Sequence, residues 1–268
     1  MNDELCPEAA HELITTFCTD AKAELENRWK HWRLDYAQLE VHEVVGALLA
    51  RQVTLATSLA KSPSLWNWSM APVVLRPMTE VYLNLAWILK DPSNRSSAFI
   101  GYGLGQMKLL IEHRKAARAD EDEPHSQFLE SAVKAMEAWV DSQLYSCLVE
   151  VNLGNWAENQ REMAREVDEL EFYNHCYTAN SAGVHSMWHH VGMFNMRQCT
   201  NPLHRFHHVP HVPDLGADVF FVLLAAKYLN MVFELFDKTT GVKADAASAL
   251  ENLIKSIRAF GASSAEGD

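Results

Sequence analysis

The chain has 268 residues, of which 48% are hydrophobic and 22% charged, so it has the composition of an ordinary globular protein near the upper size of a single domain. Its net charge of −12 argues against broad, sequence-independent nucleic-acid binding, because such binding relies on Lys and Arg to neutralise phosphates. The five cysteines form no C-x-x-C pair, and we expect reduced thiols in a cytoplasmic protein. The most apolar stretch, residues 217–236, contains Asp218, Lys227 and Glu234, which predicts a core helix and no membrane span.

Apolar residues recur every three or four positions through almost the whole chain, which predicts an all-α fold without strands. We expect a single-domain bundle of about seven to nine helices over residues 1–261 and a flexible tail over residues 262–268. The main helices are predicted at residues 4–32, 34–61, 65–89, 93–119, 217–238 and 244–260. A further helix is predicted after the acidic loop 120–124 and extends to about residue 153. Residues 172–212 differ from these segments, because they hold aromatic and small residues and most of the histidines.

A polar stripe lies on the third predicted helix. Arg76, Glu80 and Asn84 are four residues apart, so they share one face of a helix whose other positions are largely apolar. A buried charge requires a partner, and this stripe therefore predicts contacts with another part of the chain. Two interpretations remain open: a buried ion pair that fixes helix register, or part of a functional site.

The histidines are unevenly distributed, since eight of the thirteen lie within residues 175–211. His185 and His189 are four residues apart and would share a helical face, where they could bind a metal or a phosphate. One interpretation is a metal-dependent hydrolase that uses His175, His185 and His189. The other is a loop of partly exposed histidines packed on aromatic rings. Because the usual zinc and di-iron spacings are absent, we expect no metal and no cofactor.

A second ridge is expected if the segment around residue 180 is helical. Tyr173, Tyr177, Ser181 and His185 follow one another at intervals of four. Histidine can exchange protons near neutral pH, and hydroxyl groups can orient a phosphate or a water molecule. No G-x-S-x-G sequence surrounds Ser181, which argues against a serine nucleophile.

These segments resemble a bacterial domain-of-unknown-function family, number 5677. The resemblance covers about residues 41–241 and is carried by residues 76–80, 82–92 and 99–103, together with Tyr177, Ser181 and Val184-His185-Ser186. The family is helical and is similar to the HEPN superfamily, helical proteins of toxin, abortive-infection and phage-defence systems. Many HEPN proteins are metal-independent ribonucleases with an arginine, four to six residues and then a histidine. Arg197-x₆-His204 and Arg118-x₆-His125 fit this spacing.

The resemblance implies a metal-independent ribonuclease, or another nucleic-acid-directed effector of bacterial defence. His185 would be the acid and base, Arg76 would stabilise phosphate charge, and Glu80 would orient one of them. The expected substrate-binding residues, with RNA as the substrate, are Asn84, Tyr173, Tyr177, Ser181 and His189. The alternative is a non-catalytic helical module that binds a protein partner or a small ligand through its Trp and Met residues, and a homodimer is plausible in either case.

Overall fold

The computed structural model describes residues 7–117, 123–147 and 151–265 and is 72% helical with 3% strand. The all-α prediction is confirmed, and the described residues form ten helices, slightly more than the seven to nine expected. The helices of at least seven residues are α1 (Pro7–His31), α2 (Leu39–Ala60), α3 (Ala71–Ile88), α4 (Pro92–Ala117), α5 (Glu123–Cys147), α6 (Gln160–Glu166), α8 (Thr178–Val184), α9 (Trp188–Phe194), α10 (Phe220–Thr240) and α11 (Ala249–Ala265). The shorter elements are η1 (Pro63–Leu65), α7 (Leu170–Phe172), the π-helix η3 (Tyr173–Tyr177), and strands β1 (Met196–Gln198) and β2 (His208–Pro210).

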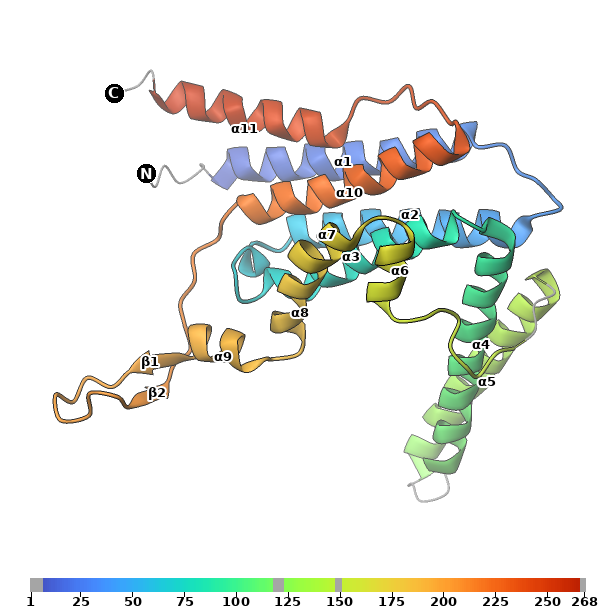
Figure 1. Cartoon of the computed structure of the whole chain (residues 1–268), viewed down its shortest axis with the longest axis horizontal. Coiled ribbons are helices and arrows are strands. Elements are labelled where there is room, and N and C mark those ends of the chain that lie inside the picture. The colour runs from blue at the N-terminus through green and yellow to red at the C-terminus, as the bar shows by residue number, and fades with distance from the viewer. Residues whose placement is uncertain (1–6, 118–122, 148–150, 266–268) are drawn as a thin grey trace.

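Helices α1, α2, α3 and α10 build the main core. Helix α10 packs against α2, α3 and α11, while α1 packs against α2 and α11, which gives the stacked layers of long helices in Figure 1. Each helix contributes an apolar face at helical spacing. The largest fully buried side chains of this core include Phe17, Leu49, Leu59, Leu83, Phe221, Phe233 and Phe236.

A buried ion cluster joins the first helix, α1, to the last two helices, α10 and α11. Arg28 of α1 donates from Nε and Nη2 to the two carboxylate oxygens of Asp237 of α10, at 2.9 and 2.8 Å. Glu24 lies one turn from Arg28, and its Oε2 accepts the backbone N–H of Ala249 at the start of α11, at 3.2 Å. Burial raises the pKa of Glu24, as expected for a carboxyl group removed from water.

Helices α4 and α5 form an arm that extends away from the bundle (Figure 1). The arm has its own small buried cluster, made of Leu104, Ile111, Val133 and Val140. In the middle of α4, a Cβ on Gly105 would lie 2.0 Å from the carbonyl oxygen of Asn152 in the loop before α6, so this close contact requires a glycine.

The two strands were not expected from the sequence, and the prediction of a strand-free chain is wrong. Strand β1 pairs antiparallel with β2, and Arg197 faces Val209 at the centre of the ladder. Each strand has three residues. Such short strands contain too few positions for an apolar and polar alternation to be recognised.

Several helix ends also differ from prediction. Helix α3 begins at Ala71, because residues 63–65 form the separate turn η1 and the Asn67 side chain accepts the N–H groups of Ser69 and Met70. Helix α11 continues to Ala265, into the segment predicted to be a tail, and residues 266–268 lie outside the description. None of the described helices combines the length and apolar character needed to cross a bilayer.

Candidate functional site

Arg76 fastens helix α3 to helix α8. Its side chain lies inside the molecule, and the residue is only 8% exposed. The Arg76 Nε donates a hydrogen bond to Ser181 Oγ at 2.8 Å, and Ser181 Oγ donates in turn to the Tyr177 carbonyl oxygen at 2.8 Å. The polar stripe of α3 and the second ridge predicted around residue 180 therefore meet at one place.

Aromatic rings cover one face of the guanidinium group. The Arg76 Cζ lies 3.2 Å from the centroid of the Tyr177 ring, and Tyr173 stacks on Tyr177 with centroids 4.7 Å apart and planes at 23°. A cation held over an aromatic face is stabilised, most strongly where water is excluded. Burial raises the pKa of Tyr177, so its phenol remains neutral around neutral pH.

Glu80 provides the ionic partner of Arg76. The Arg76 Nη1 lies 3.2 Å from Glu80 Oε2, one helical turn away, and the Glu80 side chain is 41% exposed. Although the two charged groups are in contact, the buried Nη1 makes no hydrogen bond of good geometry to any residue that the structure describes. Arg76 therefore keeps one donor nitrogen that its protein partners do not fully use.

Asn84 belongs to a different contact. Its Oδ1 accepts a hydrogen bond from Gln160 Nε2 of helix α6 at 2.8 Å. The polar stripe of α3 is consequently divided, since Arg76 reaches α8 whereas Asn84 reaches α6.

The segment that carries the second ridge has unusual backbone geometry. Tyr173–Tyr177 is a π-helix, a rare conformation that occurs often at functional sites. Helix α8 ends at Val184, His185 is its C-terminal cap, and Ser186 follows with φ of 48°. A left-handed conformation is costly for a residue other than glycine and must be held by its surroundings. Glycine is required nearby, because a Cβ on Gly183 would lie 2.9 Å from Pro72 Cβ of α3.

His185 is exposed at the end of α8, one turn beyond Ser181. Within the described ranges, no hydrogen bond, ion pair or ring contact joins His185 to Arg76 or Glu80. The structure thus gathers Arg76 and Glu80 with the hydroxyl and aromatic groups of the ridge, and it leaves His185 at the edge of this cluster.

The sequence profile of the Family of unknown function (DUF5677) matches residues 42–200. The chain belongs to this family. The matched region contains every residue of the Arg76 cluster and His185, whereas α10 and α11 lie beyond it. No curated protein and no solved structure matches the chain.

His185 and His189 of this DUF5677 protein do not share a helical face, contrary to prediction. Helix α8 ends before His185 and α9 begins at Trp188, because the left-handed Ser186 turns the chain between them. His189 is exposed on α9. In the part of the chain that the structure describes, His175, His185 and His189 do not come together as a set of metal ligands.

The two arginine–histidine pairs with HEPN-like spacing have different settings. Arg197 lies on strand β1 and His204 lies in the loop between the strands, and both are exposed. Arg118, the first member of the other pair, lies outside the described residues.

Sequence reasoning missed a second polar contact region on α3 of the DUF5677 protein. The Tyr82 hydroxyl donates to Glu169 Oε1 at 2.6 Å, and Trp87 Nε1 donates to Glu166 Oε2 at 2.6 Å. Arg95 also pairs with Glu166, and its hydrogen bond lowers the pKa of that carboxyl group. The acidic residues of segment 155–170 were a signal for such contacts, because a tyrosine or tryptophan on a buried helix needs a hydrogen-bond partner.

Proposed function

We propose that this DUF5677 protein is an HEPN-like, metal-independent ribonuclease that acts in bacterial defence. The observation that supports the proposal best is the bond between Arg76 and Ser181, which holds α8 against α3 and fixes the exposed His185 at the end of α8. The π-helix and the left-handed Ser186 on either side of α8 add weight, because both features concentrate at functional sites. The HEPN likeness itself rests on the sequence resemblance.

The reaction needs no cofactor, because RNA carries its own nucleophile. His185 takes the proton of a 2′-hydroxyl group, the 2′-oxygen forms a bond to the adjacent phosphorus, and the bond from phosphorus to the 5′-oxygen breaks. A proton returned to the 5′-oxygen completes the step, which leaves a 2′,3′-cyclic phosphate and a free 5′-hydroxyl end.

The other members of the cluster receive supporting roles. Arg76 stabilises negative charge on the phosphate through Nη1, a buried nitrogen beside Glu80 that a phosphate reaches only when the Glu80 side chain moves away. Glu80 orients the guanidinium group and, being 41% exposed, can turn toward solvent when a phosphate approaches. Tyr173 offers the outer surface of the stacked ring pair to a base of single-stranded RNA. Asn84 and His189 remain predicted substrate contacts.

The test compares wild type, His185→Ala and the control His113→Ala, which removes an exposed histidine on α4. Each purified protein is incubated with mixed cellular RNA in excess chelator, and the products are sized and their ends analysed. We expect wild type and His113→Ala to cleave equally and His185→Ala to be slower by about 100-fold or more, as for loss of a general acid or base. Equal cleavage by His185→Ala, or no cleavage by wild type, would contradict the proposal.

A binding module for a protein partner is the second candidate, and the α4–α5 arm favours it. Helix α5 packs on α4, and the arm leaves Leu109, Leu110, Phe128 and Trp139 exposed. Exposed aromatic and aliphatic side chains on one projecting element are typical of an interaction surface. This second function is supported if the wild type does not cleave RNA but self-associates in sedimentation experiments, and if the Trp139→Ser variant no longer self-associates.

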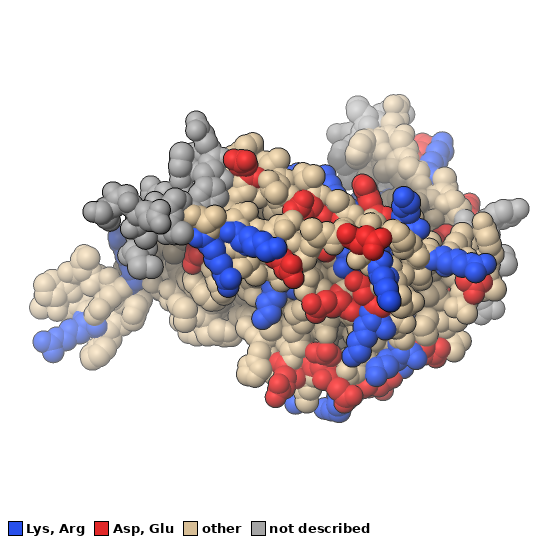
Figure 2. Space-filling view, turned by 90° about the horizontal axis from the view of Figure 1, so that it is seen from above, with Lys and Arg blue, Asp and Glu red and all other residues tan. Residues whose placement is uncertain are grey.

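A broad nucleic-acid surface is not part of either proposal. Figure 2 shows acidic and basic side chains interspersed over the face seen from above, and the chain carries a net charge of −12. RNA would therefore be engaged locally, at the Arg76 cluster.

A further inference from the structure

The loop between β1 and β2 brings together one cysteine and two histidines. Cys199 directly follows β1 and His207 directly precedes β2, and the Cys199 N–H donates to the His207 carbonyl oxygen at 2.9 Å. Two successive turns fold the loop, since His204 N–H donates to the Asn201 carbonyl oxygen and His207 N–H donates to the His204 carbonyl oxygen. As a result, one potential ligand atom from each of Cys199, His204 and His207 lies within 4.8 Å of the other two.

The separation of these atoms suits a tetrahedral metal ion. Zinc binds cysteine sulfur at about 2.3 Å and histidine nitrogen at about 2.0–2.1 Å, so two such ligands of one tetrahedron lie about 3.6 Å apart. The Cys199 Sγ and His204 Nδ1 are 3.6 Å apart. A small inward rotation of the exposed His207 ring would complete the set, because its ligand atom is already within 4.8 Å of both.

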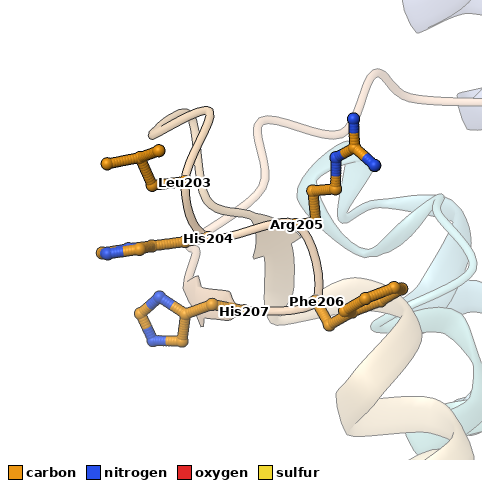
Figure 3. A pocket seen from close by; sticks show the side chains of 5 residues that line it. All are labelled: Leu203, His204, Arg205, Phe206 and His207. Atoms are coloured by element: carbon orange, nitrogen blue, oxygen red, sulfur yellow. The ribbon is translucent and has the colours of Figure 1, made fainter.

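These side chains are brought together by the Cys199–His204 hydrogen bond and by an edge-to-face contact between the rings of His204 and His207, and not by apolar packing. Every residue from Asn201 to His208 is exposed, with Leu203 at 88% and Phe206 at 94%. Figure 3 shows the His204 and His207 rings on the same side of the loop, whereas Phe206 points to the other side. A hairpin with two short strands is marginally stable by itself in water, so this loop lacks the hydrophobic core that would normally order it.

We propose that Cys199, His204 and His207 form a zinc site with three protein ligands and a fourth position occupied by water. The mixed sulfur and nitrogen ligands favour zinc over hard cations such as Mg²⁺ or Ca²⁺, which prefer oxygen. On binding, the Cys199 thiol gives up its proton and the two imidazoles bind in their neutral forms. The ion would link the two ends of the loop to its tip. It would thereby order the hairpin, whose loop residues are exposed.

This site is distinct from the proposed ribonuclease site. The Cys199 cluster lies in the loop between β1 and β2, elements that follow α9 (Figure 1), whereas Arg76 and Ser181 join α3 to α8. The proposed RNA cleavage requires no metal, so either proposal can fail without the other.

The test uses untagged, reduced full-length protein from which metal has been removed by a chelator. Cobalt(II) is titrated as a spectroscopic substitute for zinc, because thiolate ligation produces a strong near-ultraviolet absorption and a tetrahedral site produces visible bands. Zinc is then added to displace the cobalt. The variants are Cys199→Ser, His204→Ala and His207→Ala, and the matched control is His208→Ala, which removes the neighbouring histidine of β2.

We expect one cobalt ion per chain with thiolate absorption in wild type and in His208→Ala, and displacement by zinc. Cys199→Ser should lose the thiolate absorption, and each histidine variant should bind at least tenfold more weakly. Far-ultraviolet circular dichroism should be unchanged in all variants, because the hairpin tip is exposed. Absence of thiolate absorption in wild type, its persistence in Cys199→Ser, or equal weakening by His208→Ala would overturn the proposal.

Discussion

Arg76→Ala should destabilise the protein substantially, because Arg76 is a buried side chain with three partners. The substitution removes the hydrogen bond to Ser181 and the contact with the Tyr177 ring. A hydrogen bond to a charged group contributes about 1.5–3 kcal/mol, and a desolvated cation–π contact contributes about 2 kcal/mol. The pair with Glu80 adds only about 0–1 kcal/mol, because the Glu80 side chain is 41% exposed.

One contribution to the free energy opposes these losses. When the alanine variant folds, no charge has to be removed from water at this position. Replacing a buried ionic group is often less costly than its contacts suggest. We therefore expect the free energy of unfolding to fall by about 2–4 kcal/mol, less than the sum of the separate contacts.

Urea unfolding followed by circular dichroism measures this change. The control is Arg165→Ala, because Arg165 is 54% exposed and pairs with Glu162 on the surface of α6, so its loss should cost about 0–1 kcal/mol. A double-mutant cycle with Ser181→Ala should show coupling between Arg76 and Ser181. If Arg76→Ala and Arg165→Ala have equal effects, or if the cycle shows no coupling, the structural role assigned to Arg76 is refuted.

Two further predictions concern packing and pH. Gly183→Ala should cost about 1–3 kcal/mol by placing a methyl group 2.9 Å from Pro72. Gly103→Ala in α4 should stabilise the protein by about 0.5–1 kcal/mol, because among the described residues beyond its own stretch of helix none would lie within 4 Å of the new methyl group. Urea midpoints of both variants test this, and equal effects would contradict it. Burial between the rings of Trp29 and Trp32 lowers the pKa of His42 below 6.5. The neutral form is thus favoured in the folded state, so wild type should lose stability relative to His42→Phe as the pH falls from about 7.5 to about 5.5, and a constant difference across this range would be the contrary result.

The helical framework was predictable because its signal is local. In α10, apolar residues at intervals of three and four define the buried face that includes Phe221, Leu229 and Phe236. The same periodicity correctly placed Arg76 and Glu80 together on α3 and indicated that they needed partners elsewhere. It did not identify those partners, because the bond between Arg76 and Ser181 joins residues 105 positions apart.

The region around residues 185–210 was the least predictable part. His185 and His189 have helical spacing, but Ser186 adopts a left-handed conformation that glycine or asparagine would have signalled more clearly. The proximity of Cys199 to His204 and His207 depends on pairing between β1 and β2, which the sequence pattern did not reveal. Helical periodicity is read over several turns of helix, whereas these features depend on the backbone conformation of individual turns.

The segment between α7 and α10 carries Ser181 and His185 of the first candidate site and all of the Cys199 cluster, but its inner and outer parts are held in different ways. Its inner part is fixed to α3 by the Arg76–Ser181 bond and by the close approach of Gly183 to Pro72. The chain then returns to the bundle where the Asp218 N–H donates to the Trp66 carbonyl oxygen at 2.7 Å. Between these anchors, β1 packs on α9 while the loop from residue 201 to residue 208 is exposed. This outer part is held by hydrogen bonds within the hairpin and not by a buried apolar core, and for that reason a bound ion there would add order to the hairpin while contributing little to the unfolding free energy of the helical core.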